Sequence, residues 1–176
     1  QWDTAAAADT KHVFGVRDLG AGTHGHAWLV CTAAGHVCVL KFGGEDALRS
    51  ELAHWRKVYP EYEKWVRVDK WSGEYALRMP YFAPVPEDER CDDDTLRLVA
   101  AALWRFDAAG LVHGDVAWRN VGVANEAGGA RRMVLYDLGS TRSKREADQQ
   151  WMLNDLAALA PSRSPAQLQS LIDNAT

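Results

Sequence analysis

The residues best suited to chemistry lie within residues 111–120, LVHGDVAWRN. Two apolar residues predict a short strand, and Gly114 predicts a tight turn that presents Asp115. Asn120 follows five positions later. An Asp that can accept a hydroxyl proton, followed by an amide side chain that can hold a metal ion, is what a phosphoryl-transfer loop requires. Because His-Gly-Asp also occurs in ordinary turns, the interpretation depends on the other motifs of the chain.

A second acidic residue, Asp137, follows a predicted hairpin. Residues 121–124 and 133–136 predict two strands, with a turn at Gly128 and Gly129. Such a hairpin places Asp137 beside Asn120. Carboxylate and amide oxygens are ligands that suit Mg²⁺. The sequence therefore predicts that these two side chains share Mg²⁺ with the phosphates of a nucleotide.

Three glycines, Gly20, Gly22 and Gly25, lie between the predicted strands 13–19 and 26–32. A dinucleotide-binding glycine loop opens a helix. Here the following residues are AWLVC, which predict a strand, so the pattern favours a β-hairpin flap over phosphates. Glycine lets the backbone of such a flap approach a phosphate without a Cβ clash. A glycine-rich hairpin tip without a ligand is the alternative.

Lys41 ends an apolar run, residues 37–42, in which a lysine is costly to bury unless it meets a carboxylate or a phosphate. The next segment, residues 45–58, has apolar residues at helical spacing. Glu51 lies in this helix and is the predicted ion-pair partner of Lys41. Glu45 is the alternative partner. A carboxylate at this position can also simply stabilise the helix N-terminus.

Other elements surround these motifs. Strands are predicted over residues 65–71 and 74–79, and a core helix ends at Gly110 and leads directly into the Asp115 loop. Two further helices are predicted, one from Trp151 to a point near Pro161 and one over residues 164–171.

In this order, the motifs resemble the protein-kinase-like superfamily over about residues 13–139. The resemblance implies an α+β, two-lobed protein-kinase-like fold with a β-rich N-terminal lobe and a reduced, mainly helical C-terminal lobe. Residues 1–12 would be an N-terminal lead-in, residues 13–82 the N-terminal lobe and hinge, and residues 83–176 the reduced C-terminal lobe of one kinase-like domain.

The resemblance also implies cofactors and residue roles, with ATP and Mg²⁺ as cofactors. Asp115 would be the catalytic base, and Asn120 and Asp137 the Mg²⁺ ligands. Lys41 would bind the α- and β-phosphates while paired with Glu51. The triphosphate would be covered by Gly20, Gly22 and Gly25. Adenine would lie against the linker between the lobes, with Met79 as gatekeeper, Pro80 offering only its carbonyl, and Phe82 supplying a backbone N–H and C=O.

Several positions depart from the kinase pattern. Gly114 replaces an Arg that pairs with a phosphorylated activation loop in many regulated kinases, so switching by that route is not expected. Ala117 replaces a phosphate-contacting Lys, whose charge Arg119 could supply. Only 37 residues follow Gly139 (176 − 139), so the subdomain that docks peptides is absent or minimal. Asp155 would brace the backbone of the catalytic loop.

The His-Gly-Asp form resembles small atypical kinases and aminoglycoside phosphotransferases. HGDVAWRNV, together with the MPYF linker, is also similar to kinase domains of Crinkler-type effector proteins, which would imply action in the cytoplasm or nucleus of a host cell.

The composition agrees with an intracellular protein. The net charge is −4, from 20 basic and 24 acidic residues, so charge implies neither a nucleic-acid nor a membrane partner. Three Cys without framework spacing favour free thiols in a reducing compartment. No apolar run approaches the ~20 residues of a membrane helix.

The first hypothesis is a Mg·ATP-dependent phosphotransferase, a Ser/Thr-type protein kinase that acts on itself or on a protein partner. One alternative is a pseudokinase that serves as a nucleotide- or protein-binding effector module, which Ala117 and the short C-terminal lobe favour. A second is a small-molecule kinase, although the sequence shows no acidic C-terminal pocket for an aminoglycoside.

Overall fold

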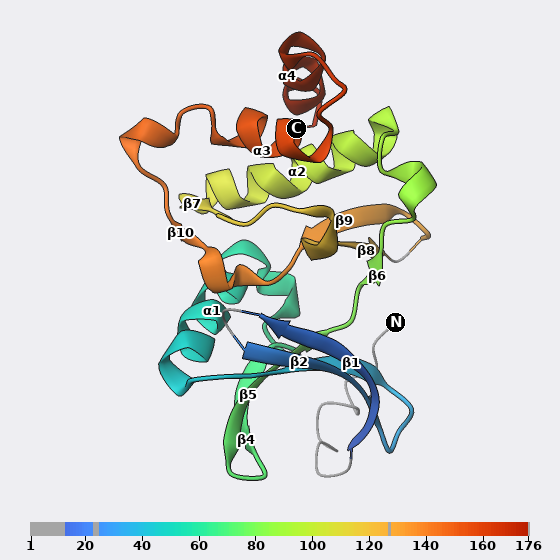
Figure 1. Ribbon diagram of the computed structural model, residues 1–176, viewed down its shortest axis with the longest axis vertical. Helices are drawn as coiled ribbons and strands as arrows, with labels where there is room; N and C mark the ends of the chain where they lie inside the picture. The colour runs from blue at the N-terminus through green and yellow to red at the C-terminus, as the bar shows by residue number, and fades with distance from the viewer. Residues whose placement is uncertain (1–12, 23–24, 127, 176) are drawn as a thin grey trace. The chain divides into compact units, whose positions relative to one another are not determined.

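The computed structural model describes residues 13–22, 25–126 and 128–175. The predicted lead-in at residues 1–12 lies outside the described residues. The chain divides into two units, of which the first ends at Tyr81 and the second begins at Phe82. The first unit is rich in strands, and the second contains three of the four α-helices described (Figure 1). The fold is thus a mixture of helices and strands with a β-rich N-terminal part.

The first unit is built on a five-stranded antiparallel sheet with strand order β1-β2-β3-β5-β4. Its strands are β1 (Val13–Gly22), β2 (Gly25–Thr32), β3 (Val37–Phe42), β4 (Arg67–Trp71) and β5 (Glu74–Pro80). In the first hairpin, Gly22 pairs with Gly25. The glycine-rich segment therefore joins two strands, as predicted, and does not open a helix.

One face of the sheet is covered by α1 (Glu45–Val58), which contacts β4 and β5. The predicted helix over residues 45–58 is confirmed at both ends. Its acidic first turn and basic last turn complement the helix dipole. Its buried stripe consists of Leu48, Leu52, Trp55 and Val58, and also Glu51. A short 3-10 helix, η2 (Pro60–Tyr62), follows.

The second unit is organised around α2 (Asp93–Ala108), which contacts β7, β9, α3 and α4 (Figure 1). Five of its apolar side chains are fully buried: Leu96, Val99, Ala100, Leu103 and Phe106. Gly110 has a φ of 68°, a left-handed conformation that commonly follows a helix end. The predicted end of this helix is therefore confirmed.

Two small sheets lie beside α2. One contains β6 (Ala83–Pro84), β8 (Val121–Asn125) and β9 (Arg131–Leu135), and the other pairs β7 (Leu111–Val112) with β10 (Arg142–Ser143). The predicted hairpin after Asn120 is confirmed as the antiparallel pair β8–β9. Four 3-10 turns link these strands and helices: η3 (Glu87–Glu89), η4 (Trp118–Asn120), η5 (Leu138–Ser140) and η6 (Glu146–Asp148).

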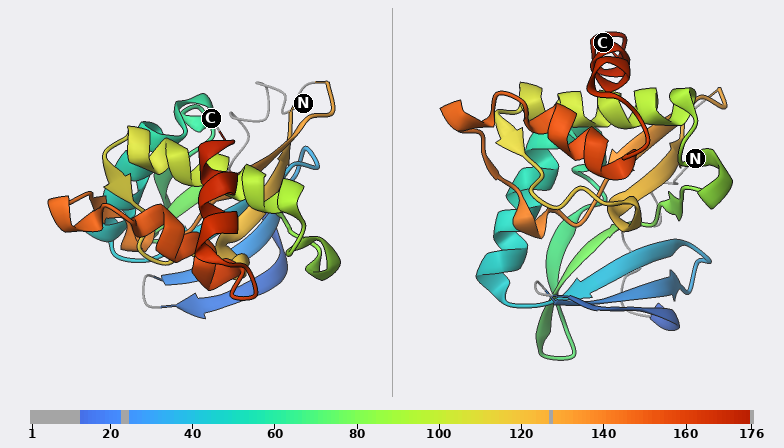
Figure 2. Two further views of the ribbon diagram at one scale, coloured as in Figure 1. Left: turned by 90° about the horizontal axis from the view of Figure 1, so that it is seen from above. Right: turned by 45° about the horizontal axis from the view of Figure 1, so that its top comes forward.

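The last two helices, α3 (Trp151–Leu159) and α4 (Pro165–Asp173), pack against α2 and against each other (Figures 1 and 2). Ser164 caps α4, because its hydroxyl accepts a hydrogen bond from the backbone N–H of Gln167. The indole of Trp104 on α2 donates to the backbone carbonyl of Ile172, 3.0 Å away. This contact ties the C-terminal helix to the centre of the unit.

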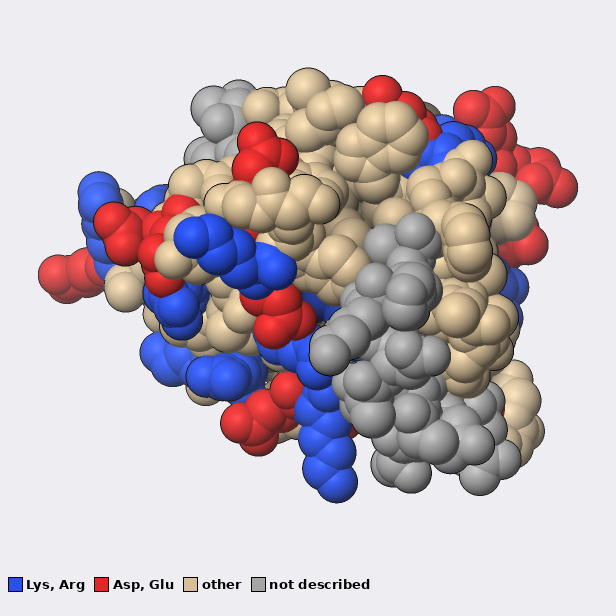
Figure 3. Space-filling model, turned by 90° about the horizontal axis from the view of Figure 1, so that it is seen from below, with Lys and Arg blue, Asp and Glu red and all other residues tan. Residues whose placement is uncertain are grey.

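On the face shown in Figure 3, Lys and Arg side chains alternate with Asp and Glu side chains beside a broad uncharged area. Within residues 13–22, 25–126 and 128–175, no helix combines the length and apolarity needed to cross a membrane. All three cysteines are free thiols. Cys38 pairs with Val30, and Cys31 pairs with Val37. The side chains of the two cysteines therefore lie on opposite faces of the sheet.

Candidate functional site

The turn that presents Asp115 depends on a glycine. Gly114 has a φ of +83°, and a Cβ at this position would lie 2.5 Å from the backbone oxygen of Ser140. Both the conformation and the close approach exclude larger residues without rearrangement. The predicted tight turn is confirmed.

The carboxylate of Asp115 is held by two neighbours on the 3-10 turn that follows it. Arg119 Nη2 donates to both carboxylate oxygens at 2.7 Å. Asn120 Nδ2 donates to Oδ2 at 3.0 Å and to the backbone oxygen of Asp115 at 2.8 Å. The Asp115 side chain is 38% exposed and that of Arg119 is 68% exposed. The carboxylate is thus oriented and accessible, and its arginine partner is free to change position.

Asn120 and Asp137 lie at the same end of the β8–β9 hairpin. The first ladder pair joins Val121 to Leu135, and the backbone N–H of Tyr136 donates to the carbonyl of Asn120 at 2.9 Å. Asp137 has φ 60° and ψ 64°, a left-handed conformation that is uncommon for a residue other than glycine. Such strain persists only where the surrounding structure imposes it, and it concentrates at functional sites.

This pair of side chains has the chemistry that Mg²⁺ requires. The amide nitrogen of Asn120 is directed at Asp115, an assignment made from the hydrogen-bond network, so its amide oxygen takes no part in those contacts. An amide oxygen and a carboxylate are hard oxygen ligands. Among the described residues, no cluster of three or more His, Cys, Asp or Glu side chains has the arrangement of a metal site. Asn120 and Asp137 would supply two oxygen ligands to such an ion.

His113 connects the Asp115 turn with the Asp137 turn, a role that sequence reasoning missed. Its ring is fully buried, and burial lowers its pKa, which keeps the ring neutral. Nε2 lies 3.0 Å from the carbonyl of Tyr136, and the backbone N–H of Asp115 donates to Nδ1 at 3.3 Å. Both contacts are satisfied when the ring carries its proton on Nε2. The backbone carbonyl of His113 also accepts a hydrogen bond from Thr141 Oγ1 at 3.4 Å.

Two aromatic residues fix the other end of the loop. The hydroxyl of Tyr136 donates to the carbonyl of Arg119 at 2.6 Å, and its ring stacks on Phe82 with centroids 6.4 Å apart. Trp118 Nε1 donates to the carbonyl of Leu159 at 3.0 Å. These contacts join residues that are distant in the chain. The only sign of them in the sequence is that an aromatic residue stands beside each motif.

In the first unit, Lys41 Nζ lies 2.7 Å from Glu51 Oε2, and the two side chains are 7% and 2% exposed. The predicted ion pair is confirmed. Glu45, the alternative partner, instead pairs with Arg49 one turn along α1 at 2.7 Å. A pair this deeply buried is costly to desolvate, so its presence is weak evidence of a stabilising role.

The glycine-rich hairpin has structural reasons for two of its glycines. Gly20 and Gly25 have φ values of +101° and +134°, and a Cβ on Gly25 would lie 2.0 Å from the carbonyl oxygen of Phe42. Asp18 accepts hydrogen bonds from His26 Nε2 and from the N–H of Gly20, both at 2.7 Å, and these bonds lower its pKa. At Gly22 a Cβ would meet nothing within 4 Å. The hairpin tip, residues 23–24, lies outside the described residues.

The predicted linker residues fall on both sides of the boundary between the units. Met79 and Pro80 end β5, where they pair with Val39 and Cys38. Phe82 begins the second unit and is buried, with its ring against Tyr136. Contact of these residues with adenine stays a prediction.

Residues 18–124 match the sequence profile of a family described as "Family of unknown function (DUF5898)". The match covers 107 of the 176 residues (124 − 18 + 1). The chain belongs to the DUF5898 family. A comparison with curated proteins found no match.

The DUF5898 match includes most of the site residues described above. It begins at Asp18, which hydrogen-bonds within the glycine-rich hairpin, and it extends past the Asp115 loop into β8. Lys41 and Glu51 lie within it, whereas Asp137 lies beyond its end. The candidate residues of this DUF5898 protein form two groups, Lys41 with Glu51 in the first unit, and Asp115, Arg119, Asn120 and Asp137 in the second.

Proposed function

We propose that this DUF5898 protein is a Mg·ATP-dependent phosphotransferase and that its two units are the lobes of a kinase-like fold. The observation that carries the proposal is the arrangement around Asp115. Its carboxylate is oriented by Arg119 and Asn120, and Asp137 stands in a strained conformation at the same hairpin end as Asn120. The buried Lys41–Glu51 pair supports it, because an ammonium group so placed is suited to phosphate oxygens.

Asp115 would accept the proton of the acceptor hydroxyl. Three hydrogen bonds to this carboxylate leave one of its roughly four acceptor sites open, and release of an oxygen by Arg119 would make it a stronger base. The exposure of Arg119, 68%, permits this release. Its guanidinium fork matches phosphate oxygens as well as it matches a carboxylate. Arg119 would then supply the positive charge that Ala117 lacks.

Asn120 and Asp137 would hold Mg²⁺, which when bound neutralises charge on the phosphate oxygens. The hydrogen bonds from Asn120 to Asp115 keep the base and the metal-binding amide in a fixed relation. His113 does the same for the Asp115 and Asp137 turns. Phosphoryl transfer needs mainly such positioning and charge stabilisation.

The acceptor that we propose first is a Ser or Thr hydroxyl of a protein, in this chain or in a partner, and the weaker Crinkler likeness would place that partner in a host cell. A small-molecule acceptor is the second candidate. The second unit has a surface cavity of about 480 Å³ lined by seven residues from Glu146 to Asn154. Glu146 contributes an exposed carboxylate to it for a cationic, hydroxylated compound, whereas the carboxylate of Asp148 is already paired with Arg142.

A pseudokinase is the third candidate. The contact of Arg119 Nη2 with both carboxylate oxygens of Asp115 favours it, because this arginine neutralises the candidate base in this conformation. An inactive protein would bind ATP without transferring phosphate.

Calorimetric titration with ATP, with and without Mg²⁺, tests the first step. We expect Mg²⁺ to strengthen ATP binding to the wild type and to have little effect on Asp137→Asn. Lys41→Met should weaken binding in both conditions. The matched control is Asp94→Asn, which replaces an exposed carboxylate on α2. This variant should bind ATP as the wild type does. Absence of ATP binding to the folded wild type would refute the proposal.

A further inference from the structure

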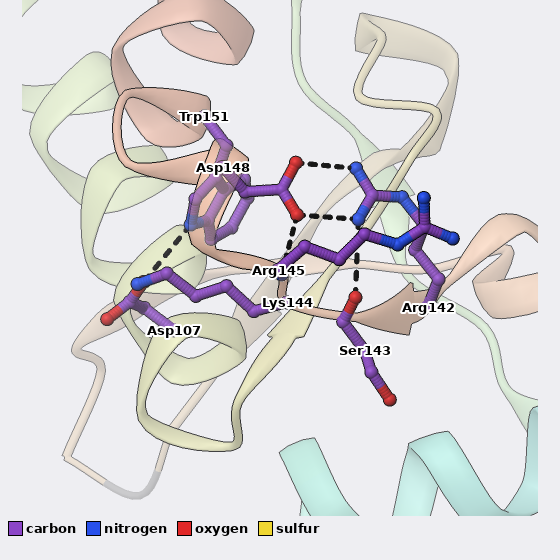
Figure 4. Close-up of polar contacts among 7 residues, drawn as sticks. All are labelled: Asp107, Arg142, Ser143, Lys144, Arg145, Asp148 and Trp151. Carbon is purple, nitrogen blue, oxygen red and sulfur yellow. Dashed lines mark hydrogen bonds and ion pairs between the residues drawn. The ribbon is translucent and has the colours of Figure 1, made fainter.

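The segment that follows Asp137 and Gly139 is tied to the rest of the second unit by ion pairs within the chain (Figure 4). Lys144 and the indole of Trp151 both donate to Oδ1 of Asp107, the indole at 3.0 Å. Arg142 forms a bidentate pair with Asp148 at 2.6 and 2.7 Å. The contacts of Asp107 join Lys144 and Trp151 to the last turn of α2, and the Arg142–Asp148 pair links two points within this segment. We call these five residues the clasp.

Asp107 stands where a carboxylate is locally unfavourable. It is the penultimate residue of α2, and the C-terminal end of a helix carries partial negative charge. Burial acts to raise the pKa of Asp107, but the hydrogen bonds from Lys144 and Trp151 outweigh it and lower the pKa. The residue is therefore ionised and compensated by its partners. A residue that violates a local rule in this way has another role in the structure.

The clasp supports a very short ladder. β7 and β10 pair through only two residues each, Arg142 with Val112 and Ser143 with Leu111, and the N–H of Lys144 donates to the carbonyl of Gly110 at 2.9 Å. So short a pairing is not stable by itself. Its register therefore depends on the side-chain contacts of the clasp.

This ladder in turn sets the geometry of the Asp115 turn. Val112 is followed by His113 and Gly114, and Arg142 is preceded by Ser140 and Thr141. Thr141 donates to the carbonyl of His113, and the backbone of Ser140 lies against Gly114. A shift of β10 along β7 would move both contacts. Asp107 thus helps to fix the position of the Asp115 turn through the pairing of β7 with β10.

We infer that Asp107 is a positioning residue for the candidate site and that the clasp keeps residues 140–150 ordered without phosphorylation. The inference rests on the proposed function for its catalytic part only. In switchable kinases a phosphate orders this kind of segment by pairing with basic side chains. Here the carboxylates of Asp107 and Asp148 already neutralise Lys144 and Arg142.

Hydrogen exchange measured by mass spectrometry on the full chain tests this order directly. We expect Asp107→Asn to raise the exchange rate of residues 140–150 about tenfold or more, since a charged hydrogen-bond partner is removed. Lys144→Met should have a similar effect, and the double variant should add little, because both changes remove one interaction. Asp94→Asn, in an exposed pair on the same helix, is the matched control and should leave exchange unchanged.

Two results would overturn the inference. One is unchanged exchange of residues 140–150 in both Asp107→Asn and Lys144→Met. The other is a rise in exchange when the wild type is treated with phosphatase. For catalysis, we expect Asp107→Asn to lower kcat about tenfold with little change in KM for ATP, and Asp107→Glu to recover part of the loss. A wild type that transfers no phosphate would refute the proposed function, and the exchange data would still decide whether the clasp orders the segment.

Discussion

Asp155 on α3 should make the folded protein less stable at neutral pH. Its Oδ2 is buried and has no hydrogen-bond partner among the described residues, so the predicted bracing of the catalytic loop is not seen for this oxygen. Burial raises the pKa of Asp155 from 3.8 to about 6, and the charge of Arg142 only partly opposes this shift. A carboxyl group whose pKa is raised on folding prefers the protonated form in the folded state.

The pKa shift sets the size and sign of the effect. Below pH 3.8, where Asp155 is protonated in both states, it imposes no penalty. The penalty grows as the pH rises from 3.8 to about 6, and it is constant above that. For a fully buried group this change of pKa would correspond to about 3 kcal/mol at pH 7.5. Because Asp155 is only partly buried, solvent screening reduces the effect, and we expect about 1–2 kcal/mol at pH 7.5 and roughly half as much at pH 5. Asp155→Asn, which is neutral and of similar size, should recover these amounts.

Urea unfolding of the wild type and of Asp155→Asn at pH 5, 6 and 7.5, followed by tryptophan fluorescence, measures the difference. The melting temperature of the variant at pH 7.5 should be higher by roughly 2–8 °C for a chain of this length. Asp148→Asn is a control of opposite sign, because the hydrogen bonds from Arg142 and from the N–H of Arg145 hold the pKa of Asp148 well below its usual range. A gain that does not depend on pH, or a loss of stability in Asp155→Asn, would refute the reasoning.

Three further substitutions have defined outcomes. Lys41→Met should destabilise the protein by about 3–5 kcal/mol in urea unfolding, because the carboxylate of Glu51 stays buried without its charge partner; addition of Glu51→Gln should recover part of the loss, and a fully additive loss would contradict this. Gly114→Ala should cost about 2 kcal/mol or more, since it combines a positive φ with a clash against Ser140; a melting temperature equal to that of the wild type would exclude the strain. Trp118→Phe should cost about 1 kcal/mol by loss of one hydrogen bond, measured in the same unfolding assay, and no change would show that the indole N–H contributes nothing.

Local patterns predicted the elements well where one physical signal dominates. The helix α1 was predicted at both ends because its apolar residues recur at helical spacing, and its acidic first turn and basic last turn agree with that pattern. The Lys41–Glu51 pair was predicted because a lysine in an apolar strand needs a carboxylate, and the next helix offers a buried one. The tight turn at Gly114 was predicted because a glycine follows a short apolar strand, and its φ of +83° agrees with this turn.

Contacts between distant segments were not predictable in the same way. Asp107 and Lys144 are 37 residues apart and meet only because β10 pairs with β7. Nothing in the periodicity of the chain indicates which of several acidic residues a basic segment will contact. The hydrogen bond of Trp118 to the carbonyl of Leu159 likewise depends on where α3 ends. Such pairings are set by topology, which a single sequence specifies only indirectly.

The central claim is that Asp115 accepts a proton during phosphoryl transfer. The most direct test is transfer of label from γ-labelled ATP with Mg²⁺ to the protein itself, to a generic acceptor protein and to a panel of hydroxylated small molecules. Wild type and Asp115→Ala are compared, with Asp94→Asn as the control. We expect labelled product with the wild type and with the control, and none above background with Asp115→Ala. Equal labelling by Asp115→Ala, or no labelling of any acceptor by a wild type that binds Mg·ATP, would contradict the account.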